Sequence, residues 1–342
     1  MKSLLVLLVP FSWLYAAVVA VRNRCYDRGI FGVVRLPVPV VSVGNMTAGG
    51  TGKTPFVEYC LRLWMKEGKR AAMVSRGYGR TTRGFVLVSD GKTVSGDART
   101  AGDEPAMIAR KFTGTVVAVD EDRVRGAREV VNRFHPDVVI LDDGFQHRRL
   151  GRSLDIVVTG AGKRLESIRM LPAGLRREPL GSLRRADLVA GYSAAGSDTP
   201  ETLRRYTGAP VITCCTAPAA IRQLGSRDVI PAAAMNVKKL VGVCGIARPE
   251  AFRSTLADQG IHPVAWMIVR DHHMYSEKDI RKVKAMVTRH AADGCVTTEK
   301  DSVRLEAAGF DVPCWYLEIE LAVTGGADLL REALLAPGKG RS

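Results

Sequence analysis

The sequence contains few aromatic residues and has no internal repeat or low-complexity tract. Aromatic residues make up 6 % of its 342 residues, while hydrophobic residues reach 46 % and charged residues 25 %. Because this composition is typical of globular proteins, it excludes a disordered chain, and the lack of a repeat excludes a repeat architecture. The chain is longer than most chains that fold around a single hydrophobic core, so we expect two domains.

The seven cysteines form no metal-binding or disulfide pattern. They are odd in number and scattered, with no Cys-x-x-Cys pair and no histidine at ligand spacing. Such cysteines are typical of reduced thiols, and we therefore expect a cytosolic environment, in which nucleotides are available.

Acidic residues are outnumbered: 35 Asp and Glu stand against 50 Lys and Arg, which gives a net charge of +15. This balance favours a polyanionic partner such as nucleic acid, an anionic membrane or a phosphorylated substrate. The excess is concentrated between Phe145 and Arg185, where ten basic residues, Lys163 among them, accompany three acidic ones. A solvated basic surface is the simpler interpretation of such a segment, and it stays open.

One long apolar stretch lies near the amino terminus. Residues 3–21 carry no charge over 19 positions, which is long enough to span a bilayer. We do not favour a cleaved signal peptide, because it would export the chain away from nucleotide and no clear Ala-x-Ala site is present. Two alternatives stay open: a single span with the arginines from Arg22 onward inside, or an interfacial helix broken near Pro10, with Trp13 and Tyr15 at headgroup level.

Short apolar runs rich in β-branched residues alternate with helical segments along the chain. This rhythm predicts parallel sheets built from βαβ units, with ligands at the carboxyl ends of the strands. The expected strands are 38–43, 71–74, 115–119, 138–141, 156–158 and 188–189, then 240–244, 263–268, 294–297 and 313–317. The expected helices are 55–67, 105–111, 123–134, 249–259 and 276–290. Residues 213–237, rich in Ala and Pro, are interpreted as the domain junction.

The most informative stretch is the glycine-rich segment 40–55. Here an apolar strand leads into Gly49-Gly50-Thr51-Gly52-Lys53-Thr54, which is typical of a loop that cradles phosphate at a helix start. Lys53 would reach the β- and γ-phosphates, and the Thr54 hydroxyl would hold Mg²⁺. Thr47 stands where the strict pattern has glycine. The residues expected to bind ATP are Asn45, Thr47, Gly49, Gly50, Thr51, Gly52, Lys53 and Thr54.

Two carboxylates follow the strand expected at 138–141. Asp142 and Asp143 would offer oxygen ligands to a hard divalent cation beside Thr54, with Asp142 favoured and the choice between them open. An ordinary boundary between strand and turn is the structural alternative. Arg76 follows another expected strand and is flanked by glycines, which is suited to binding a phosphate. The structural alternative is a turn that carries surface arginines.

Phosphoryl transfer to a hydroxyl also needs a group that accepts the proton. Asp103, in the segment Gly-Asp-Glu-Pro at 102–105, is the candidate, and an N-cap role is its alternative. The only histidine cluster, at 271–273, is a weak metal site because adjacent side chains diverge. We expect closure of the second domain to bring His272 to Asp103 and to exclude water.

Several motifs together resemble the tetraacyldisaccharide 4'-kinase family. They are the segment 44–55, Ser-Arg-Gly-Tyr-Gly at 75–79, Gly-Asp-Glu-Pro at 102–105, Asp-Asp-Gly-Phe-Gln-His at 142–147, Asp-His-His at 271–273 and Thr-Glu-Lys-Asp at 298–301. The similarity covers most of the chain, and segment 142–147 is its most specific part. Residues 171–179 are similar to the family's Leu-Pro-Ala-Gly-Pro-Leu-Arg-Glu-Pro, but Leu175 and Arg176 depart from it, which leaves the role of Arg176 open.

The resemblance implies a kinase that uses ATP and Mg²⁺ to phosphorylate the 4'-hydroxyl of a tetraacyldisaccharide 1-phosphate, forming lipid IVA for lipid A. It implies a P-loop NTPase-like α/β/α sandwich and a smaller α/β/α domain, joined by a two-stranded β linker. The expected organisation is a membrane-associated helix at 1–30, a kinase domain at 31–213 completed by a helix at about 325–342, a linker at 214–237 and the smaller domain at 238–315.

The resemblance also assigns roles to residues. Its expected catalytic residues are Lys53, Asp103 and His272, and its expected metal ligands are Thr54, Asp142, Asp143 and Glu178. Its expected substrate residues are Arg76, Tyr78, Glu104, Arg123, Gln146, His147 and Arg177.

The expected partners follow from the same resemblance. They are an anionic glycolipid and the cytoplasmic face of the inner membrane, with no nucleic acid and with the protein as a monomer. The alternative function is a phosphate-loop ATPase or GTPase that works as a switch or assembly factor at the membrane. Such a protein needs neither an apolar amino terminus nor a basic acceptor groove.

Overall fold

The computed structural model describes residues 7–160, 164–193, 196–226 and 228–337. Lys163 of the basic segment, residues 3–6 of the apolar stretch and residues 338–342 of the expected last helix therefore lie outside the described residues. The chain divides into two compact units. The first unit comprises Met1–Arg76, Gly114–Thr216 and Leu321–Ser342, and the second comprises Gly77–Thr113 and Ala217–Glu320.

The first unit is built on a parallel sheet. Its strands are β1 (Val40–Asn45), β2 (Ala71–Ser75), β4 (Val116–Val119), β5 (Val138–Asp142), β6 (Leu154–Thr159), β7 (Leu188–Tyr192) and the first part of β8 (Val211–Gln223). Their order is β4-β2-β5-β1-β6-β7-β8, and each neighbouring pair is parallel. Of these strands, all but β8 are buried throughout, as their continuous apolar runs predict for a sheet covered on both faces.

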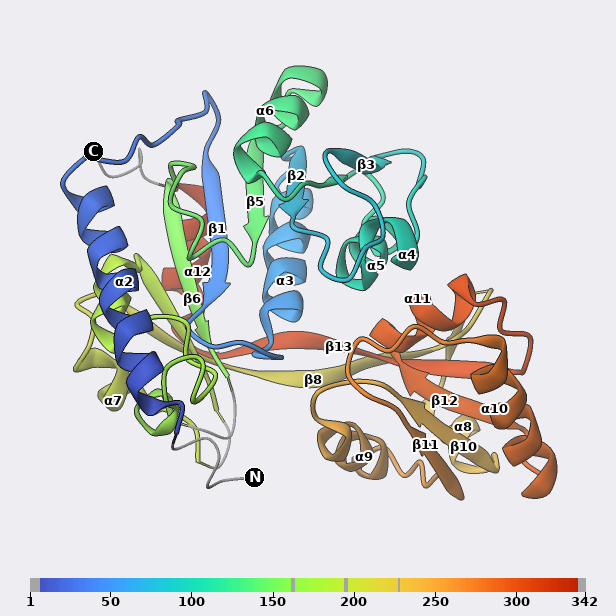
Figure 1. Ribbon diagram of the computed structural model, residues 1–342. Coiled ribbons are helices and arrows are strands. Elements are labelled where there is room, and N and C mark those ends of the chain that lie inside the picture. The colour runs from blue at the N-terminus through green and yellow to red at the C-terminus, as the bar shows by residue number, and fades with distance from the viewer. Residues whose placement is uncertain (1–6, 161–163, 194–195, 227, 338–342) are drawn as a thin grey trace. The chain divides into compact units, whose positions relative to one another are not determined.

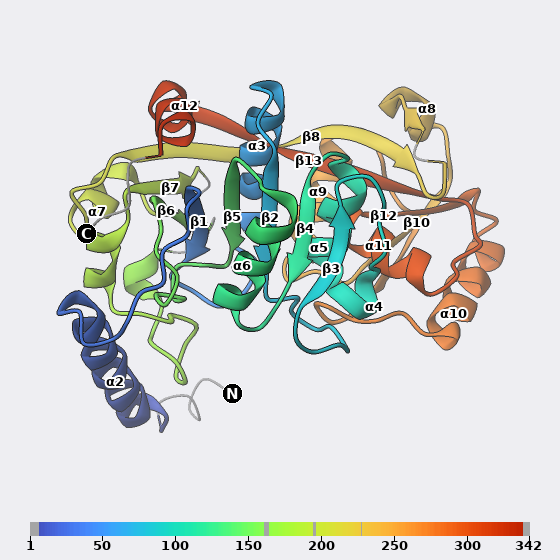
Figure 2. The same ribbon diagram turned by 90° about the horizontal axis from the view of Figure 1, so that it is seen from above.

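Helices cover both faces of this sheet. They are α2 (Val9–Asp27), α3 (Lys53–Lys66), α6 (Arg123–Phe134), the short α7 (Pro200–Arg204) and α12 (Ala327–Leu335). Figure 2 shows α3 and α12 on one face, with α6 on the other. Trp64 of α3 is fully buried, and its indole nitrogen donates to the Leu334 carbonyl of α12 at 3.0 Å. This contact fixes the helix that follows the glycine-rich loop against the end of the chain.

The second unit has a smaller sheet in the order β11-β10-β12-β13-β8. The strands of this order are β10 (Leu240–Cys244), β11 (Ala265–Ile268), β12 (Gly294–Thr298), β13 (Cys314–Gly325) and the second part of β8. The second unit also contains β3 (Val86–Asp90) and β9 (Val229–Ile230). Its helices are α4 (Ala98–Ala101), α5 (Asp103–Lys111), α8 (Ala232–Asn236), α9 (Pro249–Asp258), α10 (Glu277–Arg289) and α11 (Glu299–Ala307). Strands β10 to β13 are parallel, so both units have the α/β architecture that the sequence predicts.

Two long strands, β8 and β13, pass between the units in opposite directions (Figure 1). They are neighbours in the sheet, and the Leu224 amide donates to the Cys314 carbonyl at 2.8 Å within the second unit. In the first unit the Thr324 hydroxyl donates to the Thr213 hydroxyl at 3.0 Å. The predicted two-stranded linker is confirmed. Residues 213–223 are regular strand because β7 and β13 pair with them, although their own pattern is weak.

Three local features differ from the sequence-based expectations. Helix α11 follows β12 directly, where no helix was expected. The segment Gly77–Thr113 belongs to the second unit, although it lies within the range expected for the first domain. Pro10 does not break a helix but lies in the first turn of α2, where its missing N–H costs no hydrogen bond.

Helix α2 carries the described part of the apolar stretch. Within residues 7–160, 164–193, 196–226 and 228–337, no helix is both long enough and apolar enough to cross a membrane.

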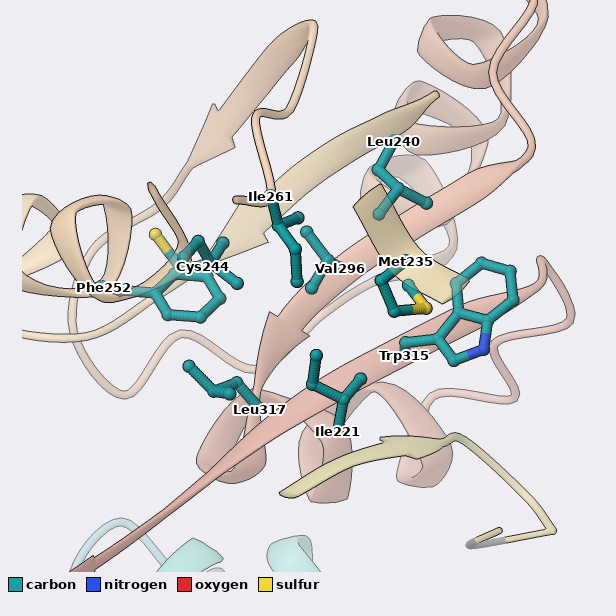
Figure 3. Close-up of a cluster of buried hydrophobic side chains, with 10 residues drawn as sticks. Ile221, Met235, Leu240, Cys244, Phe252, Ile261, Val296, Trp315 and Leu317 are labelled. Atoms are coloured by element: carbon teal, nitrogen blue, oxygen red, sulfur yellow. The ribbon is translucent and has the colours of Figure 1, made fainter. Parts of the chain in front are cut away.

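A hydrophobic cluster holds the second unit together. Figure 3 shows side chains from β8, α8, β10, α9, β12 and β13 converging, and Met235 of α8 lies among them with no solvent exposure. The short helix α8 is therefore stabilised by the core rather than by its own length.

Substitution Met235→Ala should destabilise the second unit by about 2–5 kcal/mol, because it removes buried methylene groups and leaves a cavity. The free energy of unfolding, measured with urea, checks this. Val237→Ala is the matched control, because Val237 lies two positions away and is 86 % exposed. Equal losses in the two variants would contradict the packing described above.

Candidate active site

The glycine-rich loop lies between β1 and α3 in the first unit. Gly52 is the N-cap of α3 with φ of +84°, a left-handed conformation that favours glycine. A Cβ at Gly52 would lie 2.4 Å from the ring of Tyr192, whose hydroxyl donates to the Gly52 carbonyl at 2.9 Å. The loop therefore requires glycine here for two reasons, conformation and space. Inside the loop, the Asn45 amide donates to the Thr51 hydroxyl at 2.8 Å.

The amino-terminal end of α3, where the helix dipole is positive, lies at the glycine-rich loop. Lys53 and Thr54 are the first two residues of this helix, and the backbone N–H groups of a first helical turn are suited to an anion. The residues expected to bind ATP, from Asn45 to Thr54, thus lie together between the end of β1 and the start of α3. Their role in binding phosphate stays a prediction.

Asp143 pairs with two cations beside this loop. Its carboxylate lies 3.3 Å from Lys53 Nζ and accepts from Arg177 Nη1 at 3.0 and 2.8 Å. Burial raises the pKa of Asp143, but Lys53 and Arg177 outweigh that effect and hold the pKa below its usual value. Asp143 is therefore an anion that positions a lysine and an arginine at the edge of the loop. Its role as a metal ligand stays a prediction.

Asp142 is the buried carboxylate of the pair. It ends β5 opposite Val43 of β1, so that it lies at the same sheet edge as the loop, and it accepts from the Ser75 hydroxyl at 3.1 Å. No cluster of three or more Asp, Glu, His or Cys side chains that could hold a metal occurs in the described part of the chain. Thr54 and Asp142 nevertheless supply the oxygen donors that Mg²⁺ takes in a phosphate-loop site, where water and phosphate complete the shell.

Glu178 has four donors on its two oxygens. It accepts from Arg185 at 2.8 and 3.0 Å, from Asn23 at 2.8 Å and from Gln146 at 3.2 Å. Burial raises the pKa of Glu178, but the Arg185 hydrogen bonds outweigh it and lower the pKa below its usual value. These contacts make Glu178 a structural anion beside the loop, and its expected role as a metal ligand stays a prediction.

Gln146, expected in the substrate site, touches the loop directly. Its amide also donates to the Asn45 carbonyl at 3.0 Å. His147 and Arg123 lie nearby. Burial lowers the pKa of His147 to about 4 and the charge of Arg123 adds to that effect, so that Arg123 carries the positive charge while His147 is neutral near pH 7. Within the described chain, no acceptor faces the buried Nε of Arg123 or the Nε2 of His147. Both atoms are buried, whereas Arg76, which directly follows β2, is exposed.

Asp103 and His272 lie together in the second unit. His272 Nδ1 is 3.0 Å from Asp103 Oδ2, and Asp103 is 6 % exposed. Asp103 is the first residue of α5, whose N-cap is Gly102, so the N-cap role considered for Asp103 is wrong. One unit contains both residues, and the expected closure of the second domain onto the acceptor stays a prediction.

The two groups shift each other's titration. The hydrogen bond to Asp103 raises the pKa of His272 above its usual value, although burial opposes it. Burial raises the pKa of Asp103, but the His272 hydrogen bond and the nearby cationic side chains outweigh it and hold the pKa well below its usual value. The contact therefore favours the charged form of each group, imidazolium for His272 and carboxylate for Asp103.

Two cations missed by sequence reasoning surround this pair. Lys300 pairs with Glu104, the residue next to Asp103, and Arg304 Nε lies 3.7 Å from Asp103 Oδ2. Arg304 is 1 % exposed and also donates to the His273 carbonyl at 3.3 Å. Lys300 stands in the Thr-Glu-Lys-Asp motif, which offered a signal, whereas the role of Arg304 depends on the α5–α11 packing.

Tyr78 completes this group. It is 66 % exposed, and its ring meets the His272 ring edge-on with centroids 5.1 Å apart. The predicted site residues thus fall into two groups. Tyr78, Asp103, Glu104 and His272 belong to the second unit, and the other predicted site residues belong to the first.

Comparisons with known proteins agree on one family. A family model described as Tetraacyldisaccharide-1-P 4'-kinase matches residues 4–337. A tetraacyldisaccharide 4'-kinase of Chlorobaculum parvum is 41 % identical and covers 98 % of this chain and 95 % of its own. One from Geobacter metallireducens is 39 % identical and covers 89 % of both chains. A crystal structure of LpxK from Aquifex aeolicus in complex with ATP covers 97 % of this chain and 98 % of its own, with 31 % identity and a TM-score of 0.80.

The pairing of Asp103 with His272 predicts a pH-dependent signature. The raised pKa of His272 means that its contribution to stability is complete below the unfolded value of about 6.5 and is lost as pH rises through the folded value. Titration of His272 by NMR should show this elevated pKa, and Asp103→Asn should lower it by removing the anion. An unchanged His272 titration in Asp103→Asn would contradict the pairing.

Proposed function

This chain belongs to the tetraacyldisaccharide 4'-kinase family, and we propose that it phosphorylates its acceptor with the Asp103–His272 pair as the base. It is an ATP-dependent kinase of lipid A biosynthesis that transfers the γ-phosphate of ATP to the 4'-hydroxyl of a tetraacyldisaccharide 1-phosphate. Family membership overturns the alternative of a phosphate-loop switch or assembly factor. The observation that carries the proposal is the 3.0 Å contact between a buried carboxylate and an imidazole.

The carboxylate of Asp103 accepts the proton of the acceptor hydroxyl. His272 holds the carboxylate in place and keeps it anionic through the same hydrogen bond. A weakly basic carboxylate suffices, because the transition state of phosphoryl transfer is loose and the attacking oxygen becomes acidic only as its bond to phosphorus forms. Arg304 supplies a fixed positive charge behind the pair.

The first unit supplies the nucleotide site. The loop and the start of α3 bind the phosphates through backbone N–H groups, and Lys53 neutralises their charge. Thr54 and Asp142 would hold Mg²⁺, which would supply positive charge to the phosphates. We infer that the cationic groups around Arg123 and Arg177 bind the anionic glycolipid rather than a nucleic acid.

Substitution of either member of the pair should lower turnover. We expect Asp103→Asn and His272→Gln each to reduce kcat by about 100-fold or more, since general base catalysis contributes about that much. Transfer of label from γ-labelled ATP to the glycolipid in detergent gives kcat. The KM for ATP should change little, because the phosphate loop belongs to the other unit.

His273→Gln is the matched control for these variants. His273 is the neighbouring histidine, but its ring contacts Asp279 at 3.0 Å instead of Asp103. Its turnover should stay near that of the unsubstituted enzyme. If the variants at 272 and 273 behave alike, or if turnover survives in Asp103→Asn, the proposed base is wrong.

We propose that α2 binds the membrane surface. Leu7, just before the helix, and Phe11, Leu14, Val18 and Val21 within it are 58–70 % exposed. Their spacing of three and four places them in one apolar stripe. Exposed Arg24 and Arg28 lie at the end of the helix, where they suit anionic headgroups. This arrangement supports a helix lying in the interface. We propose that the membrane face is the cytoplasmic face of the inner membrane and that the protein is a monomer.

Polar substitutions in the stripe should release the protein from lipid. We expect Phe11→Ser together with Leu14→Ser to weaken binding to vesicles containing phosphatidylglycerol by about tenfold or more, because apolar surface no longer enters the bilayer. Sedimentation with vesicles measures the binding. Val237→Ser, on an exposed valine of the second unit, is the control and should bind normally. Equal binding of all three proteins would contradict the proposal.

A further inference from the structure

Two polar residues of helix α2 lie on its buried side. Ser12 and Asn23 are 5 % and 7 % exposed, whereas the apolar stripe faces outward. A buried polar side chain is retained at a cost unless hydrogen bonds satisfy it, so the partners of these two residues indicate what the inner face does. Membrane binding alone requires only the outer face.

Both Ser12 and Asn23 form hydrogen bonds with one segment, Arg169–Glu178, which we call the strap. The Ser12 hydroxyl donates to the Met170 carbonyl at 3.0 Å and accepts from the Ala173 amide at 3.1 Å. Near the other end of the helix, the Asn23 amide donates to Glu178 at 2.8 Å. Helix α2 is therefore tied by hydrogen bonds to both ends of the strap.

The strap has internal hydrogen bonds of its own. The Leu171 amide donates to the Arg176 carbonyl at 2.9 Å, and the Arg176 amide donates to the Arg169 carbonyl at 3.0 Å. The Arg176 guanidinium also donates to the Leu165 carbonyl at 3.1 Å. Arg176, whose role the sequence left open, thus closes the strap against its neighbouring turn, and a movement of either end is transmitted along the segment.

The opposite edge of the strap pairs with the phosphate loop. The Ala48 amide donates to the Leu175 carbonyl at 2.8 Å, and the Arg177 amide donates to the Met46 carbonyl at 2.7 Å. The side chain of Arg177 then holds Asp143, the partner of Lys53. The strap therefore positions both the backbone of the loop and the side chains at its edge.

We propose that Asn23 and Ser12 are positioning residues for the ATP site, acting through the strap, so that α2 is part of the nucleotide-binding scaffold as well as a membrane-binding element. The proposal rests on the proposed function of the phosphate loop in binding ATP. Membrane contact on the outer face and loop geometry on the inner face are coupled through one helix. Perturbing the inner face weakens ATP binding even where no membrane is present.

The test separates the two faces of α2 in the full-length protein in detergent. Variants Asn23→Leu and Ser12→Ala each remove the hydrogen bonds to the strap, and we expect each to raise the Kd for ATP by about fivefold or more. Calorimetry with ATP and Mg²⁺ measures the Kd without an acceptor, and the label-transfer assay gives the KM for ATP. Ala17→Ser, at an exposed position of the same helix, is the matched control and should leave both values unchanged.

The readouts distinguish positioning from loss of folded protein. A merely structural role would lower the fraction of active protein and leave the Kd and KM of the remainder unchanged, which would overturn the proposal. Ser12→Ala removes a single oxygen atom, so the Kd for ATP can still be compared in this variant if Asn23→Leu does not fold. Vesicle binding by Ser12→Ala should be normal, because the apolar stripe is intact. If the unsubstituted protein does not bind ATP, the proposed function fails; if it binds and both variants bind equally well, only this inference fails.

Discussion

The backbone conformation of the phosphate loop is the constraint on which the first unit depends. A loop that presents its N–H groups to an anion cannot satisfy them within itself, so neighbouring segments must fix its shape. Tyr192 packs on Gly52 and donates to its carbonyl, and the strap pairs with the loop at Met46 and Ala48. Tyr192 is the last residue of β7, so the carboxyl end of that strand supplies one of these supports.

Charge is arranged differently in the two units. In the first unit, Asp143 and Glu178 are anions that hold cationic and amide side chains around the place where phosphate binds. In the second unit, one buried carboxylate is held ionised by an imidazole and a guanidinium. The first arrangement suits the binding of anions, while the second suits the acceptance of one proton. This division agrees with a kinase that must bind two phosphorylated substrates and activate one hydroxyl.

Most elements of the fold could be predicted from the sequence. Strand β10 and helix α6 lie at their predicted positions, because continuous apolar runs and a clear helical period are local signals. Strand β8 and helix α11 could not be predicted in the same way. The first is stabilised by its neighbours in the sheet, and the second presents Lys300 and Arg304 to α5, a contact between segments about 200 residues apart in the chain.

The sequence by itself determined the family, the nucleotide loop and the identity of the proposed base, because each depends on residue types at fixed spacing. Only the tertiary structure decided which groups act together. Asp103 lies in one unit with His272, Arg304 lies beside Asp103 and donates to the His273 carbonyl, and Asn23 of α2 contacts the strap instead of water. These pairings depend on burial and on contacts between distant segments. A pattern read along the chain contains neither, since burial and contact arise only when the elements pack.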